Sequence, residues 1–428
     1  MTGKRVSCSA NVRTCTLPSF SGTEGLPMSD SAFSKDNRWL LPEGVDELLP
    51  PRAAQMETLR RQLLDQFGAW GYELVMPPFI EYLDSLLTGT GHDLDVQTFK
   101  LTDQLTGRLM GVRADITPQV ARIDAHRLRR EAPSRLCYIG SVLHARPEGI
   151  SRSRNPVQVG AELFGHAGVE SDIEIISLAV ASLRTAGVAQ PHLDLGHVGI
   201  FRGLARAAGC TPAQEGALLE ALQRKAVAEI DELLDEAAID PHLRRMLRAL
   251  PQLNGGLEAL DHAGEVLAEA PQGVRQALRT LWGVAAGLER RLPDLPLHFD
   301  LAELRGYGYH TGIVFAALVP GYGSEVARGG RYDDIGRVFG NPRPATGFSA
   351  DLRTLVQVAD GQPAVPAGKG VLAPWGDEPD LIKVIEALRA EGERVVQELP
   401  GQQGGAAAQG CDRRLQQDDG GGWVTRPL

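Results

Sequence analysis

A chain of 428 residues with 43% hydrophobic content is long enough for one large domain and a smaller one, each with its own core. No run approaches the roughly 20 consecutive apolar residues that cross a bilayer, and the N-terminal segment lacks the continuous apolar stretch of a secretory signal. We therefore expect a cytoplasmic protein without a membrane partner. The net charge of −10 lowers the expectation of nucleic-acid binding, because nucleic-acid-binding surfaces are usually basic.

The cysteines are scattered and form no C-x-x-C pair, so the sequence predicts neither a zinc site nor a disulfide framework. They are Cys8, Cys15, Cys137, Cys210 and Cys411. We expect no metal and no cofactor.

The first 33 residues are rich in Ser, Thr, Gly and Pro, which predicts a disordered extension in which Met28 could be the true start. A large domain is expected over residues 34–360. It begins with a predicted helix that carries an apolar stripe, followed by a strand over 72–77 that ends at Pro77-Pro78. The residues of the stripe are Met56, Leu59, Leu63 and Phe67.

Strand-like and helical segments then alternate, which predicts an α+β domain around one antiparallel sheet. The predicted strands are 109–113, 136–143, 157–164 and 192–195, and the predicted helices are 117–128 and 171–184. Residues 211–291 have the leucine spacing of helices and are predicted to be a helical insertion.

A small C-terminal α/β segment is expected over residues 361–428, with Asp360–Pro363 as a plausible linker. Its predicted elements are strands over 370–375 and 394–399 and a helix over 380–392. The glycine-rich stretches 402–405 and 420–422 have the composition of flexible connectors.

Three blocks of the sequence are rich in glycine, arginine and polar residues. The first is Arg113-Ala114-Asp115-Ile116-Thr117, followed by Arg122. The second runs from Tyr138-Ile139-Gly140 to Gln158-Val159-Gly160-Ala161-Glu162-Leu163-Phe164-Gly165. The third is Arg305-Gly306-Tyr307-Gly308-Tyr309-His310-Thr311-Gly312, followed by Gly329-Gly330-Arg331-Tyr332-Asp333. Together these blocks resemble the histidyl-tRNA synthetase family, a class II aminoacyl-tRNA synthetase family, and Arg122 stands at the spacing of a family arginine.

The resemblance implies a histidine-binding site. It assigns Asp115 to the imidazole, Thr117 to a place near the amino group, and Gln158 and Glu162 to the ammonium. Arg305 would hold the carboxylate, and Tyr309 and His310 stand where the family has two tyrosines. These residue types suit a free amino acid, because an ammonium needs acceptors and a carboxylate needs a fixed cation. The alternative is that the same polar side chains only satisfy one another.

The resemblance also indicates that the ATP chemistry of the synthetases is lost. The arginine that would clamp the α-phosphate falls at His144, and its glutamate partner falls at Arg146, unless the loop slips so that Arg146-Pro147-Glu148 takes both roles. The arginine that would hold the γ-phosphate falls at Thr354. A hydroxyl cannot replace a planar, permanently charged guanidinium. We expect Arg353 to point to another face of its helix.

The synthetase-like domain keeps the residues that would bind the amino acid but lacks the phosphate clamps, and the tail that follows it is too short for a full anticodon-binding domain. In this combination the chain resembles the regulatory subunits of ATP phosphoribosyltransferase. The resemblance implies a non-catalytic chain that joins the short-form catalytic subunit in the first step of L-histidine biosynthesis and mediates its feedback inhibition by histidine. It also implies a two-fold dimer, through the predicted helix and strand over 56–77. Two alternatives remain, namely another non-enzymatic paralogue, such as an amino-acid sensor or a tRNA-binding module, and an active histidine-tRNA ligase.

Overall fold

The computed structural model describes residues 39–88, 92–147, 153–237, 239–359 and 370–428. The N-terminal extension with Met28, Cys8 and Cys15, the residue Glu148, and the linker Asp360–Pro363 lie outside the described residues, so the expectations for them stay predictions. Within the described ranges, no helix is long and apolar enough to span a membrane.

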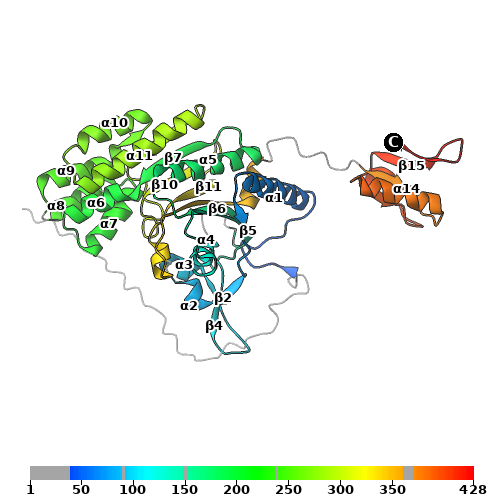
Figure 1. Cartoon of the computed structure of the whole chain (residues 1–428), viewed down its shortest axis with the longest axis horizontal. Coiled ribbons are helices and arrows are strands. Elements are labelled where there is room, and N and C mark those ends of the chain that lie inside the picture. Colours follow the sequence, from blue (N-terminus) through cyan, green and yellow to red (C-terminus); the bar gives the residue numbers. More distant parts are fainter. Residues whose placement is uncertain (1–38, 89–91, 148–152, 238, 360–369) are drawn as a thin grey trace, which may run out of the picture. The chain divides into compact units, whose positions relative to one another are not determined.

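The large domain is built on a nine-stranded sheet with the strand order β1-β5-β6-β12-β11-β10-β7-β9-β8 (Figure 1). In this order the strands are Glu73–Leu74, Ser134–Ser141, Val157–Phe164, Ala345–Asp351, Ala327–Arg331, Ile313–Leu318, His192–His197, Leu297–Asp300 and Asn254–Gly255. All neighbouring pairs are antiparallel except β1–β5 and β7–β9. The predicted α+β fold is confirmed, and three of the predicted strands coincide with β5, β6 and β7 to within two residues.

One face of this sheet is covered by helices. They are α1 (Arg52–Ala69), α5 (Val169–Thr185), α11 (Gln272–Arg291) and α13 (Leu352–Ala359). The predicted stripe of α1 faces inward, since Leu63 and Phe67 are fully buried and the Phe67 ring meets Phe348 of β12 edge to face. The inward-facing side chains of this stripe are therefore not available to a second copy, while the dimer expected through residues 56–77 stays a prediction. The chain itself covers these side chains, because α1 packs on α5 and α13 and its apolar face is used inside one subunit.

The strand predicted over 72–77 is shorter than expected. Only β1 (Glu73–Leu74) pairs, in parallel with β5, and the chain then passes Pro77-Pro78 into β2 (Ile80–Tyr82). A proline has no N–H to donate to a ladder, so the strand stops there. Several apolar side chains near this edge stay exposed, among them Leu74, Met76, Phe79 and Ile80.

A second sheet of three strands, in the order β2-β4-β3, holds the segment predicted as the strand 109–113. Here β4 is Leu109–Val112 and β3 is Phe99–Thr102, and the short helices α2 (Leu83–Leu86) and α3 (His92–Gln97) connect the strands. The expectation of a single antiparallel sheet thus needs this correction. Periodicity along one strand does not report which sheet the strand joins, because that depends on its long-range partner.

The other face of the nine-stranded sheet carries α4 (Thr117–Ile123), which continues as a π-helical turn over Asp124–Leu128, and α12 (Ile335–Val338). Side chains from these helices and from β5 and β6 form a second apolar cluster around Ile116, Val120, Tyr138, Phe164 and Tyr332. Alternate side chains of β5 and β6 point to this face of the sheet, and the first turn of α4 therefore packs against them.

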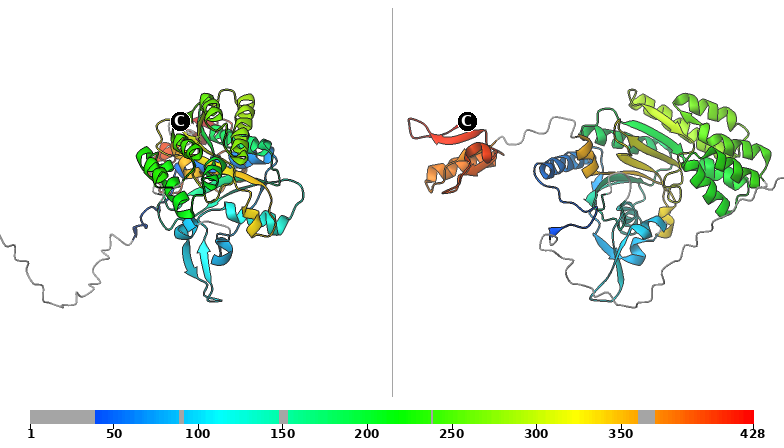
Figure 2. Two further views of the ribbon diagram at one scale, coloured as in Figure 1. Left: turned by 90° about the vertical axis from the view of Figure 1, so that its left-hand side faces the viewer. Right: turned by 180° about the vertical axis from the view of Figure 1, so that it is seen from behind.

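Over the residues predicted to be a helical insertion, the chain forms a set of helices that pack on α6 (Val198–Ala207), which Figure 2 shows in green from two further sides. It contains α7 (Pro212–Gln223), α8 (Val227–Glu236), α9 (Pro241–Ala249), the 3-10 turn Leu250–Gln252 and α10 (Leu257–Val266) before α11. The sequence did not predict β8, a two-residue strand that pairs with β9.

The C-terminal segment forms a four-stranded sheet with the order β14-β13-β15-β16. Its elements are β13 (Val371–Ala373), α14 (Pro379–Ala390), β14 (Val395–Gln397), α15 (Gly405–Ala408), β15 (Arg413–Gln417) and β16 (Trp423–Pro427). The expected flexible connector at Gly420–Gly422 is instead the turn between β15 and β16. Asp418 Oδ1 accepts from the backbone N–H groups of Gly420 and Gly422 at 2.9 and 2.8 Å, and Gly421 has a φ of +79° that favours glycine.

Candidate functional site

Glu162 is the most buried carboxyl group of the predicted site. It lies on β6 with 1% of its surface exposed, and hydroxyl groups surround it. Thr117 Oγ1 and Tyr138 Oη each donate to Glu162 Oε1 at 3.0 Å, and Tyr332 Oη donates to Oε2. Burial raises the pKa of Glu162 to about 8, against the three hydroxyl donors, which favour the charged form.

Asp115 is the centre of a second polar group. It lies two residues before Thr117, the first residue of α4. Its Oδ1 accepts from the backbone N–H of Thr117 at 3.0 Å and from Gln158 Nε2 at 2.7 Å. The Gln158 side-chain oxygen in turn accepts from the N–H of Ile116 at 2.8 Å. Because Gln158 and Glu162 are four residues apart on one strand, they point to the same face of the sheet. The structure thus brings together Asp115, Thr117, Gln158 and Glu162.

Tyr309 joins this group through its ring and leaves its hydroxyl without a partner. The ring stacks on Tyr332 with centroids 5.0 Å apart, and the buried hydroxyl makes no hydrogen bond to any described residue. Burial raises the pKa of Tyr309, and the nearby carboxyls of Glu162 and Asp115 raise it further. An unpaired buried hydroxyl between two acidic groups is the kind of polar atom that a bound ligand would satisfy.

His310 lies beside Tyr309 and away from the carboxyl groups. Its ring meets Tyr309 edge to face at 5.4 Å, and its Nδ1 lies 3.3 Å from the carbonyl oxygen of Arg331. Burial lowers the pKa of His310 to about 4, so the imidazole is neutral at pH 7. A neutral, ring-packed histidine here has the contacts of a structural residue.

Glycines on the strands make room for these side chains. A Cβ atom on Gly347 would lie 1.5 Å from Glu162 Oε2, and one on Gly160 would lie 2.5 Å from Tyr138 Oη. One on Gly330 would lie 2.9 Å from the His310 ring. Gly160 and Gly330 belong to the motif blocks, and all three glycines leave the space that these side chains occupy.

Arg305, the predicted cation for the ligand carboxylate, pairs with other residues instead of with this group. It is half exposed, and its guanidinium forms ion pairs with Glu303 at 3.0 Å and Glu325 at 3.2 Å. Among the described contacts, no hydrogen bond or ion pair joins Arg305 to Asp115, Gln158 or Glu162.

The positions that correspond to the first ATP clamp hold other contacts. His144 Nε2 lies 3.0 Å from the carbonyl oxygen of Ala114, while Arg146 is exposed to solvent. His144 therefore bonds to the backbone next to Asp115.

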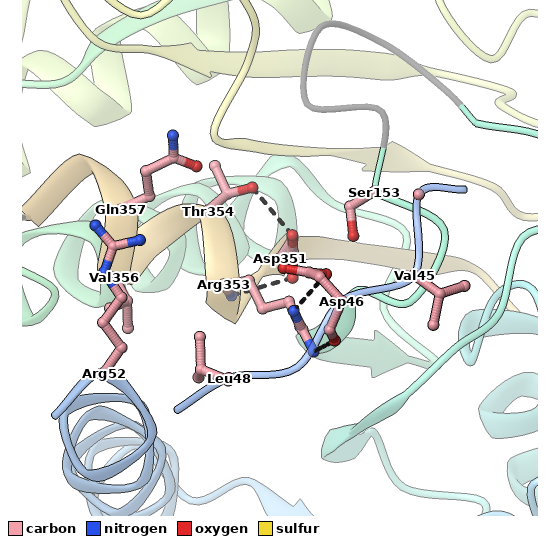
Figure 3. Close-up of a pocket in the computed structure, with 11 residues that line it drawn as sticks. Val45, Asp46, Leu48, Arg52, Ser153, Asp351, Arg353, Thr354, Val356 and Gln357 are labelled. Carbon is pink, nitrogen blue, oxygen red and sulfur yellow. Dashed lines mark hydrogen bonds and ion pairs between the residues drawn. The ribbon is translucent and has the colours of Figure 1, made fainter. Parts of the chain in front are cut away.

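Thr354, at the position of the second clamp, is buried and bonds to Asp351, the residue just before its helix. Its hydroxyl donates to Asp351 Oδ2 at 3.0 Å, while Asp351 Oδ1 accepts from the backbone N–H groups of Arg353 and Val157. Figure 3 shows Thr354 turned toward Asp351 and Arg353 turned toward Asp46, with which it pairs at 2.8 Å. Both residues border a cavity of about 270 Å³. Arg353 is thus neutralised by Asp46 and does not take the place of the missing clamp.

Tyr138 and Tyr332 belong to the site although the sequence did not single them out. Each donates to Glu162, and each is almost fully buried. Their place in the motif blocks was the available signal, but a buried tyrosine is more often a core residue. Only the hydrogen bonds that both hydroxyls donate to Glu162 distinguish them. Within the described part of the chain, no group of three or more His, Cys, Asp or Glu residues could hold a metal ion.

Comparisons with known proteins agree with this geometry. Residues 44–355 match the family described as histidyl-tRNA synthetase, and residues 368–426 match the ATP phosphoribosyltransferase subunit HisZ C-terminal domain. A crystal structure of an ATP phosphoribosyltransferase regulatory subunit/histidyl-tRNA synthetase from Bacillus halodurans C aligns with a TM-score of 0.76 and 27% identity, over 86% of this chain and 95% of that one. The chain thus has the class II fold of the histidyl-tRNA synthetases.

Relatives of higher identity narrow this class to one family. The ATP phosphoribosyltransferase regulatory subunit of Thioalkalivibrio sulfidiphilus is 58% identical over 396 residues, which cover 92% of this chain and 100% of the relative. The subunit of the same name from Stutzerimonas stutzeri is 58% identical over 393 residues, 92% of this chain and 98% of the relative. The chain belongs to the family of ATP phosphoribosyltransferase regulatory subunits. The predicted family, and with it a regulatory chain of histidine biosynthesis in place of a catalytic enzyme, is confirmed.

Proposed function

We propose that this chain joins the short-form catalytic subunit of ATP phosphoribosyltransferase in the cytoplasm and makes that enzyme responsive to histidine. The observation that carries the proposal is a contrast within one domain. The residues expected to bind the amino acid are present around Glu162 and form hydrogen bonds with one another. At the two clamp positions, Thr354 and His144 bond to the chain's own side chains and backbone. A domain of this kind can bind an amino acid without activating it.

The burial of the Glu162 and Asp115 carboxyl groups supports a ligand orientation in which their two roles, toward the ammonium and toward the imidazole, are exchanged relative to the expectation from the sequence. Glu162 lies deepest, among three tyrosine rings, while Asp115 is only partly buried and has the amide of Gln158 beside it. A planar imidazole with N–H donors suits a recess lined by aromatic rings, and an ammonium suits the less buried acceptors. We therefore infer that Glu162 faces the imidazole and that Asp115 and Gln158 face the ammonium.

Control by histidine requires that histidine bind two states of the complex with different affinities. The Asp115–Thr117 turn leads directly into α4, and the Tyr309 loop leads into β10. A ligand bonded to both would tie these two elements together. The state of the complex in which they lie at the right separation would be favoured by bound histidine.

We further propose that two copies of the chain associate near β1. The support is the exposure of Met76, at 78%, with Leu74, Phe79 and Ile80 close to it in sequence. Apolar surface of this kind is typical of an interface, and the family resemblance implies a dimer through this part of the chain.

The experiment that tests the proposal is reconstitution. The chain and the short-form catalytic subunit, expressed together, should co-purify, and the activity of the complex should be lost when this chain is omitted and inhibited when histidine is added. Recovery of tRNA in place of the catalytic subunit would contradict the proposal, as would a complex whose activity histidine leaves unchanged.

A further inference from the structure

Arg113 is a buried cation without a carboxylate partner. Its residue surface is 7% exposed, and its guanidinium donates from Nε to the carbonyl oxygen of Ser141 and from Nη1 to that of Pro77, each at 2.8 Å. No ion pair involves it among the described residues. The Phe79 ring lies 5.6 Å away, and burial lowers the pKa of Arg113. Buried charges are normally paired, so this guanidinium lacks an anion.

The acidic side chain whose charge acts on Arg113 is already engaged. Glu81 raises the pKa of Arg113 through its charge, but its Oε1 accepts from Arg122 at 2.5 Å and from Gln119 at 2.8 Å. Glu81 therefore belongs to another ion pair and does not bond to Arg113.

The Arg113 head group lies on the face of the sheet that carries the candidate site. A Cβ atom on Gly140 would be 2.3 Å from Arg113 Nη2, and Gly140 is paired directly with Gln158 across β5 and β6. Side chains of directly opposed residues point to the same face with Cβ atoms about 5 Å apart. The guanidinium thus lies beside the root of Gln158, whose amide binds Asp115. Gly140 leaves the space in which the guanidinium lies.

This placement puts a cation next to the acceptors for an ammonium. An α-amino acid carries its ammonium and its carboxylate on one carbon atom, so its binding site needs acceptors and a fixed cation side by side. Asp115 and Gln158 supply the acceptors. Arg305 is a poor choice for the cation, because Glu303 and Glu325 already pair with it and it is half exposed.

We propose that Arg113, and not Arg305, is the cation that binds the α-carboxylate of the amino-acid ligand. This inference rests on the proposed function, since it assumes that histidine binds at the Asp115–Glu162 group. A guanidinium preorganised by two carbonyl acceptors keeps its remaining donors free for a carboxylate. It would give the site a preference for a free amino acid over an amide or ester of the same amino acid.

The test compares two ligands that differ only in this group. Dissociation constants for histidine and for histidinamide, whose carboxamide carries no charge, are measured by calorimetry on the reconstituted complex. The wild type should bind histidine at least about tenfold more tightly than histidinamide. In Arg113→Gln the ratio should fall close to one because histidine alone binds more weakly. In Arg305→Gln the ratio should stay at the wild-type value.

Each variant carries its own control, because histidinamide reports whether the rest of the site is intact. If Arg113→Gln does not fold, Gly140→Ala replaces it, since the added methyl group must displace the guanidinium while the charge stays in the protein. Its ratio should also fall several-fold. A wild-type ratio retained in Arg113→Gln, or in Gly140→Ala where the first variant is insoluble, would overturn the inference and leave the proposed function standing. So would a ratio that collapses in Arg305→Gln. Failure of the wild-type complex to bind histidine at all would remove the proposed function and the inference together.

Discussion

The hydroxyl of Tyr138 on β5 donates to Glu162 on β6 at 3.0 Å, inside a core from which both side chains are almost completely shielded from water. Tyr332, directly after β11, and Thr117 at the start of α4 complete the same group. Three separate segments of the chain thus converge on one buried carboxyl. A buried carboxyl held by three hydroxyl groups is a specific feature, because each donor would be costly to bury without it.

The first prediction concerns Glu162→Gln. The change preserves volume but replaces one carboxyl oxygen with an amide NH2 group. A buried donor that bonds to this oxygen then loses its acceptor, which costs roughly 1 to 3 kcal/mol. The inhibition constant for histidine should rise about tenfold or more. It is measured from the activity of the reconstituted complex as a function of histidine concentration. The matched control is Glu220→Gln on the exposed side of α7, which should be inhibited like the wild type. Unchanged inhibition of Glu162→Gln would place the effector elsewhere.

The second prediction is a pH dependence of stability that comes from Glu162. Its pKa is about 8 in the folded chain and about 4.5 in the unfolded chain, so between these values the folded state holds a proton that the unfolded state has lost. The free energy of unfolding should therefore fall as the pH rises from about 5 to about 8. In Glu162→Gln this contribution should be absent.

Urea denaturation at several pH values gives this contribution as the difference between the two proteins. The difference is needed because burial lowers the pKa of His310 and of His197 to about 4. Those groups act in the opposite direction, and only up to about pH 6.5. Parallel curves for wild type and variant would show that Glu162 is ionised in the folded protein at pH 7.

The third prediction is that the chain makes no histidyl-adenylate. With Thr354 bonded to Asp351, and Arg353 paired with Asp46, no described guanidinium occupies the second clamp position. Loss of even one group that stabilises charge in a transition state costs roughly 3 to 4 kcal/mol. Pyrophosphate exchange into ATP should remain at the level of a control without protein, with a histidyl-tRNA synthetase as the positive control. Histidine-dependent exchange above that level would contradict the regulatory assignment.

A related variant tests how far the site has diverged. The double change His144→Arg and Thr354→Arg is not expected to restore exchange, because His144 also bonds to the backbone at Ala114 and Thr354 bonds to Asp351 at the start of α13. Positioning errors of about 1 Å can reduce catalysis about a hundredfold.

The fourth prediction separates the core from the proposed interface. Leu63→Glu or Phe67→Glu should unfold or aggregate the chain, because both side chains are completely buried within it. Met76→Glu should leave the chain folded but shift it toward monomer, as measured by light scattering at micromolar concentration. Val338→Glu, a like change at an exposed position on α12, is the control and should leave the assembly unchanged. A dimer that persists in Met76→Glu would exclude this edge of β1 as the interface.

Local patterns in the sequence predicted most of the elements. The spacing of Leu59, Leu63 and Phe67 gives an inward face to α1, and β6 begins and ends at the predicted residues Val157 and Phe164. The motif blocks around Asp115 and Glu162 also predicted that these carboxyl groups belong to one site. The predictions of helices and strands succeed because such an element repeats its side-chain directions with a fixed period.

The tertiary structure decided which part of the protein each apolar face packs against. Period alone says that α1 has an apolar face, but only packing on α5 and α13 shows that this face is internal. The sequence also does not show which arginine is left available to bind a carboxylate. From the sequence, Arg305 is a plausible partner for a carboxylate, yet Glu303 and Glu325 neutralise it in the fold.

What the sequence determined by itself is the set of residue types and the periods along each segment, and these were sufficient for the family, the element order and the loss of arginine at positions 144 and 354. Only the tertiary structure decided that Tyr138 and Tyr332 bond to Glu162, that Asp351 holds Thr354, and that Arg113 is left without a carboxylate. The physical reason is that hydrogen bonding and desolvation act over a few ångströms of space, between residues whose separation along the chain carries no such information.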